Sequence, residues 1–97
     1  MIIEHALVRI DADDRESFEA DARAALPLIT AAAGCHGAEF RRQHEDDTTY
    51  LLLVRWDSVD AHMEFRATEL FTQWRALTHH HYVSPAEVTH YLEPIAR

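Results

Sequence analysis

Histidine is the residue type in this chain best suited to moving protons, and two of its occurrences stand out. His5 is a polar side chain inside an aliphatic and β-branched segment, residues 2–10, and His79 to His81 form an unbroken run. A neutral imidazole accepts a proton near neutral pH, so it suits general base catalysis. We therefore take His5 and His80 as candidate catalytic residues. The alternative for His5 is a partly buried histidine that is simply hydrogen-bonded within a sheet.

The histidine run also raises the question of a metal site. In an extended chain His79 and His81 share a face, whereas adjacent side chains do not converge on one point. Such a pair, joined by His5 or His90, would resemble the three-histidine sites of zinc and iron. No carboxylate accompanies the run at a typical ligand spacing. The sequence therefore predicts no metal, and the alternative is a histidine-rich loop at the end of a sheet.

Five further side chains are suited to holding a small aromatic molecule. Phe65 and Trp74 can stack on a ring, and Arg66 can stabilise an oxyanion. Tyr82 and His90 can hydrogen-bond to a ligand oxygen. The alternatives are core packing for the aromatic rings and a surface ion pair for the arginine.

The hydrophobic period changes several times along the chain and indicates the elements that must position these residues. The expected order is a strand over 2–10, a helix ending near Gly34, strands over 38–45 and 49–56, a short helix over 59–66, a second helical segment after Thr68, and a strand over 86–92. This β-α-β-β-α-β order predicts an α+β, ferredoxin-like fold with an antiparallel sheet and helices on one face.

The first helix carries three terminal or interrupting signals. Asp13 and Glu16 have the spacing of a capping box. Pro27 lies within the apolar stripe and predicts a kink, and Gly34 predicts the end of the helix.

The third expected strand, residues 49–56, is apolar on both faces. The helices of one chain can cover only one face of the sheet, so the other face should be covered by a second copy. This pattern predicts a homodimer.

Composition excludes several classes of protein. The 97 residues suit one domain, and the net charge of −8 without a basic cluster argues against binding to nucleic acid or to an anionic membrane. All nine basic residues are arginine, so a lysine Schiff base is excluded. A single cysteine and an N-terminus without a basic n-region predict a cytoplasmic protein.

Several stretches resemble one family. They are YLLLVRWD at 50–57, FRATELF at 65–71, WRAL at 74–77, VTHY at 88–91 and the opening IEHA at 3–6. Together they resemble the antibiotic biosynthesis monooxygenase family over nearly the whole chain, 1–97. The resemblance implies a dimeric α+β barrel. Some members oxidise quinol-like aromatics with O₂ and no cofactor, one branch degrades haem, and many have no known activity.

The sequence departs from two patterns of that family. Phe65 stands where many members have a histidine, and the positions of the haem-degrading branch are occupied here by His5, Phe65 and Arg75. The leading hypothesis is a cofactor-independent monooxygenase acting on a small aromatic or quinol molecule with O₂, with His5 as base or positioning group. The alternatives are a non-catalytic dimeric module that binds a small molecule or only assembles, and a metal- or haem-binding protein.

Overall fold

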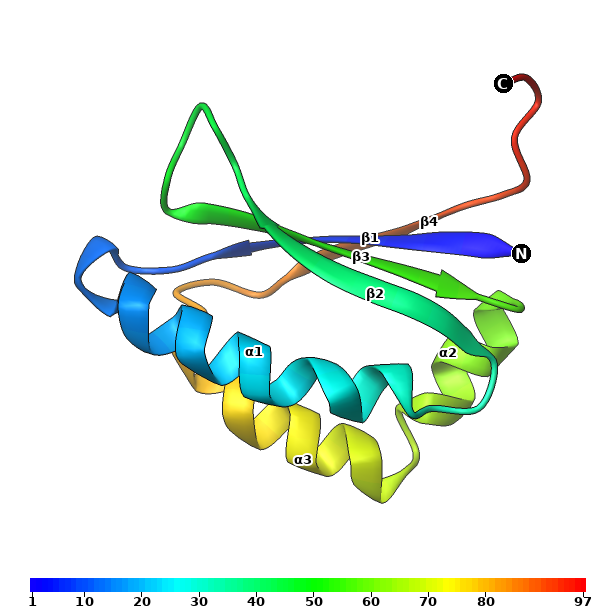
Figure 1. Ribbon diagram of the computed structural model, residues 1–97, viewed down its shortest axis with the longest axis horizontal. Coiled ribbons are helices and arrows are strands. Elements are labelled where there is room, and N and C mark those ends of the chain that lie inside the picture. The colour runs from blue at the N-terminus through cyan, green and yellow to red at the C-terminus, as the bar shows by residue number, and fades with distance from the viewer.

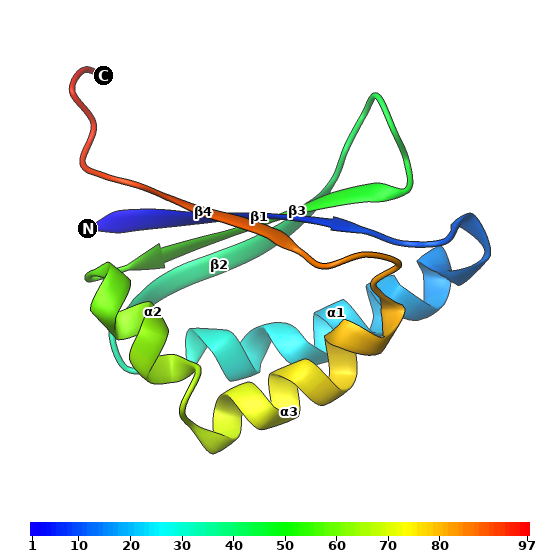
Figure 2. The same cartoon turned by 180° about the vertical axis from the view of Figure 1, so that it is seen from behind.

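Four antiparallel strands form one sheet in the order β2-β3-β1-β4, and the long helices pack on one face of it in the computed structural model, which describes residues 1–97 (Figure 1, Figure 2). The strands are β1 (Ile2–Arg9), β2 (Cys35–Arg42), β3 (Thr49–Trp56) and β4 (Glu87–Tyr91). The helices are α1 (Arg15–Thr30), α2 (Val59–Phe65) and α3 (Glu69–Thr78), with 3-10 turns η1 (Ala12–Asp14) and η2 (His79–His81). The expected α+β, ferredoxin-like arrangement is confirmed.

The two faces of the sheet follow from the alternation of side chains along each strand. β1 lies at the centre, where Glu4 is paired with Val54 of β3 and with His90 of β4. The even-numbered residues of β1 and β3 face the helices and are buried: Ile2, Glu4, Ala6, Val8, Tyr50, Leu52, Val54 and Trp56. Side chains at the intervening positions, such as Leu7 and Leu53, lie on the face that carries no helix and are only partly buried.

Hydroxyl groups cap the first turns of α2 and α3. The Ser58 Oγ accepts a hydrogen bond from the Ala61 amide at 3.1 Å, and the Thr68 Oγ1 accepts one from the Phe71 amide at 3.4 Å. Each cap satisfies an amide that has no partner within its helix. The caps fix where α2 and α3 start and therefore which of their side chains face the sheet.

Two boundary predictions are wrong. Asp13 lies inside η1, and α1 begins at Arg15 without a side-chain cap, so no capping box forms. β2 spans Cys35–Arg42 instead of residues 38–45. The reason is the turn that follows: the Asp46 carboxylate accepts hydrogen bonds from the Thr48 amide and from two threonine hydroxyls, so residues 43–48 form the hairpin loop.

Pro27 lies within α1, which continues to Thr30, and the expected kink stays a prediction.

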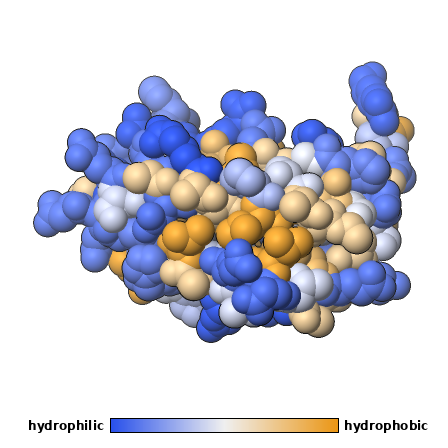
Figure 3. Space-filling view, turned by 60° about the horizontal axis from the view of Figure 1, so that its bottom comes forward, coloured by the Kyte–Doolittle hydropathy of each residue, from blue (hydrophilic) through white to orange (hydrophobic).

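The helix side of the molecule, which comes forward in Figure 3, shows hydrophobic surface gathered near the centre with hydrophilic surface around it. None of the helices combines the length and hydrophobicity that a membrane-spanning segment requires.

Candidate active site

A cavity of about 830 Å³ lies between the sheet and the helices. Its floor comes from β1, β3 and β4, and its walls come from α2, α3 and the segment after α3. Most of its lining is apolar, including Ala6, Val8, Ile29, Leu52, Met63, Phe65, Phe71, Trp74, Val83 and Val88. The volume is in the range of small-molecule sites, which combine an apolar lining with a few convergent polar groups.

The polar groups of the cavity lie in a continuous chain of close contacts. The Glu4 Oε1 accepts a hydrogen bond from the Trp56 indole at 2.9 Å and lies 3.3 Å from the His62 Nε2. The His62 Nδ1 lies 2.8 Å from the His90 Nε2. A carboxyl group and two imidazoles are thus connected from the interior of the protein to His90, which is partly exposed.

Local structure explains why these groups meet. Glu4 and His90 are directly paired across β1 and β4, so their side chains leave the same face of the sheet. His62 and Phe65 are three residues apart on α2 and therefore share a side of that helix. The His62 ring stacks on Trp56 with centroids 5.2 Å apart and an interplanar angle of 16°, which holds it over Glu4.

Burial shifts the protonation of both members of this pair. Burial raises the pKa of Glu4, and the Trp56 hydrogen bond and the Arg66 charge reduce the rise. Burial also lowers the pKa of His62 to about 4, with the charges of His90 and Arg66 acting in the same direction. His62 is therefore a neutral imidazole at pH 7. With its proton on Nε2, His62 presents that N–H toward Glu4 at 3.3 Å, and its Nδ1 accepts from the His90 Nε2–H.

The second carboxylate oxygen of Glu4 is available to a ligand. Both contacts of the carboxylate are made by Oε1, and Oε2 has no partner within the chain. No fully buried side-chain polar atom lacks a hydrogen bond, so this oxygen keeps some accessible surface. Glu4 is one of the residues that line the cavity, so a ligand there would approach this carboxylate.

Arg66 is an exposed, positively charged residue that lines the cavity. Its guanidinium carbon lies 5.7 Å from the centroid of the Phe71 ring, a cation–π arrangement that keeps the side chain near the cavity. Its charge lowers the pKa values of both Glu4 and His62. The same charge would stabilise a ligand anion at this position.

The aromatic walls are part of the core. Phe65 packs edge-on against Phe71 with centroids 5.5 Å apart, and Trp74 stacks on Phe40 at 5.7 Å with an interplanar angle of 6°. Both Phe65 and Trp74 are 3% exposed. These rings therefore give the cavity a shape that is fixed by core packing.

The five residues expected to contact a ligand all line this cavity: Phe65, Arg66, Trp74, Tyr82 and His90. The structure brings them together from α2, α3, the following loop and β4. Their roles toward a ligand stay predictions.

The two candidate bases lie elsewhere, which corrects the expected site. His5 is on the sheet face away from the helices, where its ring packs edge-on against Tyr91 at 5.7 Å. Side chains alternate along β1, so the residue that faces the cavity is its neighbour Glu4. The His80 side chain points toward α1 and is 59% exposed. Its Nδ1 lies 3.1 Å from the carbonyl oxygen of Ala76.

Sequence reasoning missed Glu4 and His62. Glu4 carried a usable signal, because it is the one charged residue on the β1 face formed by Ile2, Ala6 and Val8. His62 stands beside acidic residues in the sequence, which favours a solvated side chain, yet it is only 6% exposed. Its three-residue spacing from Phe65 places it on the apolar side of α2.

Comparison with known proteins assigns this chain to a family. The model of the family described as "Antibiotic biosynthesis monooxygenase" matches residues 1–77. The chain belongs to this family, in agreement with the resemblance of its strand and helix motifs.

Relatives extend the match over almost the whole chain. A crystal structure titled "putative antibiotic biosynthesis monooxygenase", from Bordetella bronchiseptica, superimposes with a TM-score of 0.91 at 35% identity and covers 97% of both chains. The uncharacterized protein YczJ of Bacillus subtilis is 32% identical over 92 residues, which are 94% of this chain and 97% of YczJ. Rv0793 of Mycobacterium tuberculosis has the same fold, with a TM-score of 0.80 at 22% identity over 99% of this chain and 96% of its own.

Proposed function

We propose that this protein is a monooxygenase that oxidises a small phenol or quinol with O₂ and without an organic or metal cofactor. The observation that carries the proposal is the Glu4–His62–His90 chain at the wall of a mostly apolar cavity. Family membership supports an oxygenase, and the cavity supports an aromatic substrate. A carboxyl group with a raised pKa is suited to take a proton from a phenolic hydroxyl group near neutral pH.

The reaction needs no external reductant. Removal of the phenolic proton gives an electron-rich phenolate, which transfers electrons to O₂. One oxygen atom then forms a bond to a ring carbon, and the other leaves as water. The balance is phenol plus O₂ giving quinone plus water, or quinol plus O₂ giving hydroxyquinone plus water, so the substrate itself supplies the four electrons.

Each polar group has a distinct part in this scheme. Glu4 accepts the proton at Oε2, which has no other partner. His62 steadies the carboxylate through the contact of its Nε2 with Oε1, and His90 steadies His62 through the hydrogen bond at 2.8 Å between their rings. Arg66 stabilises the phenolate oxygen, since an anion in an apolar cavity requires a compensating charge. Phe65 and Trp74 hold the ring of the substrate.

The working unit is a homodimer. The face of the sheet that bears no helix carries Ile3, Leu7, Leu51 and Leu53, all partly buried in the isolated chain. An apolar sheet face of this kind is stabilised by packing against another layer. A second copy supplies that layer without using the cavity, which lies on the opposite face.

Oxygen uptake tests the proposal. Metal-stripped protein is given reduced polycyclic quinols and simple hydroquinones, and the rate is compared with spontaneous oxidation. Uptake above the spontaneous rate is expected for the wild type, and a loss of about 10²–10⁴-fold is expected for Glu4→Gln, which removes the base. His44→Ala, an exposed change in the hairpin loop, is the matched control and keeps full activity. Equal rates in Glu4→Gln and wild type would contradict the assignment of the base.

A further inference from the structure

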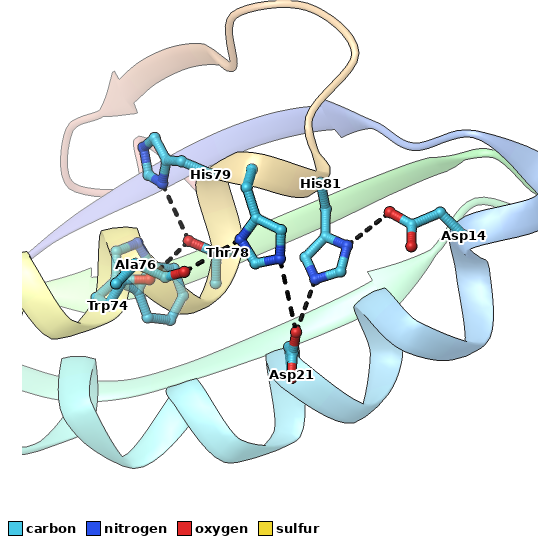
Figure 4. A network of polar contacts seen from close by, with 8 residues as sticks. Asp14, Asp21, Trp74, Ala76, Thr78, His79 and His81 are labelled. Atoms are coloured by element: carbon cyan, nitrogen blue, oxygen red, sulfur yellow. Dashed lines mark hydrogen bonds and ion pairs between the residues drawn. The ribbon is translucent and has the colours of Figure 1, made fainter.

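The three histidines of η2 lie in two different surroundings. His79 lines the cavity, whereas His81 points toward Asp21 of α1 (Figure 4), and His80 approaches the same residue. The His81 Nε2 lies 2.8 Å from the Asp21 Oδ2, and the His80 Nε2 lies 3.9 Å from the same oxygen. Two adjacent histidines therefore converge on one carboxylate, contrary to the expectation for neighbouring side chains, because the tight 3-10 turn brings their rings to 4.0 Å.

We propose that Asp21, His80 and His81 bind a divalent transition-metal ion of the zinc class, with Asp14 positioning His81. Two imidazole nitrogens and one carboxylate are a ligand set that Zn²⁺ accepts, and a water molecule completes the four-coordinate shell. Mg²⁺ and Ca²⁺ prefer shells made of oxygen atoms, so the two imidazoles select against them. Nothing in the oxygenase mechanism proposed above uses this cluster.

The spacing of the donor atoms fits such an ion. Bonds of about 2.0–2.1 Å in a tetrahedral shell place the ligand atoms about 3.3 Å apart. The observed separations of 2.8 Å and 3.9 Å lie on either side of this value, and one ligand atom from each of the three residues lies within 4.8 Å of the others. The side chain of His80 is 59% exposed, so it can adjust and leaves a path for the metal to enter.

The buried ligand is held in the correct orientation. The His81 side chain is 3% exposed, and its Nδ1 lies 2.6 Å from the Asp14 Oδ2 (Figure 4). Donation from Nδ1–H to Asp14 leaves the lone pair of Nε2 pointing at Asp21, which is the carboxylate–histidine–metal arrangement of many zinc sites. A metal ion would take the place of the proton that otherwise joins His81 to Asp21.

The proposed metal site lies outside the cavity, but it connects two elements that lie beside the cavity. Asp21 belongs to α1, and the histidines belong to η2, which leads into the cavity segment beginning at Tyr82. A bound ion would fasten η2 to α1 and so steady one wall of the cavity. It would also raise the stability of the whole fold, because it binds the folded chain more tightly than the unfolded one.

Calorimetric titration of chelator-treated protein with ZnCl₂ tests the proposal directly, since its readout does not depend on enzymatic activity. One ion per chain is expected, with MgCl₂ giving no heat of binding. His80→Ala should weaken zinc binding at least tenfold, and Asp14→Asn should weaken it by about 10–100-fold, as the loss of an orienting carboxylate does. His44→Ala controls for weak binding to exposed histidines and should leave the affinity unchanged.

Two further measurements keep the result interpretable. Circular dichroism confirms that each variant is folded, and His80→Ala is the decisive one because its exposed side chain makes one hydrogen bond, to the backbone at Ala76. The visible absorption of Co²⁺ in place of Zn²⁺ should indicate a four-coordinate site and disappear in His80→Ala. Absence of zinc binding by the wild type, or equal affinity in wild type and folded His80→Ala, would overturn the proposal.

Discussion

The protonation of His62 predicts a specific dependence of stability on pH. Burial holds the pKa of His62 at about 4 in the folded protein, against 6.5 for an ordinary histidine. Between these values the unfolded chain binds more protons than the folded one, so the free energy of unfolding falls as the pH is lowered through this window. His62→Gln removes the titrating group, and its amide can still hydrogen-bond toward Glu4 and His90.

The two pKa values fix the size of the effect. If the shift from 6.5 to about 4 acted in full, lowering the pH from 7 to 5 would cost the wild type about 2 kcal/mol through His62 alone. The side chain is 8% exposed, but the adjoining cavity opens to solvent and screens part of this cost. We therefore expect the wild type to lose about 1–2 kcal/mol more than His62→Gln over this range.

Urea unfolding at pH 5, 6 and 7 measures the difference, at one fixed protein concentration because a dimer is stabilised by mass action. Contributions from titrating groups that do not contact His62 are common to both proteins and cancel. As the pH falls below 6.5, the free energy of unfolding should fall more steeply for the wild type than for His62→Gln. Parallel curves would refute the conclusion that His62 is neutral and desolvated in the folded chain.

Three other substitutions have defined outcomes. Trp56→Phe removes the indole donor to Glu4 and leaves a space in the core, so it should lower stability by about 2–4 kcal/mol, measured by urea unfolding. Gly34→Ala should cost about 1–2 kcal/mol in the same assay, because Gly34 has a φ of +82° and a Cβ there would lie 2.8 Å from that of Ala61. Leu53→Asp buries a charge in the proposed dimer contact and should weaken self-association roughly tenfold or more, measured by sedimentation equilibrium; an unchanged dimer would exclude this sheet face as the contact.

The fold was predictable because its signals are local. Residues 49–56 were expected as a strand and form β3, and the helical segment expected after Thr68 is α3, which Thr68 caps. The first helix was less accurate, since a capping box at Asp13 and Glu16 competes with a 3-10 turn that the pattern does not reveal. Period and capping depend on neighbours along the chain, which the sequence displays directly.

The site was predictable only in part, because it depends on contacts between distant elements. Phe65, Trp74 and His90 line the cavity, and their contacts with a ligand stay predictions. Choosing His5 over Glu4 required knowing which face of β1 meets the helices, and a one-residue step reverses that choice. The joining of His62 to His90 connects α2 with β4, 28 residues apart, and no local pattern reports such a contact.

The most direct test of the proposed oxygenation is the fate of the oxygen atoms. Chelator-treated protein and a quinol that supports oxygen uptake are incubated under ¹⁸O₂, and the products are analysed by mass spectrometry. The proposed mechanism predicts one labelled oxygen atom in the quinone and the other in water, with the labelled product lost in Glu4→Gln and retained in His44→Ala. A quinone without label, or labelled product formed only after a metal ion is added back, would contradict it.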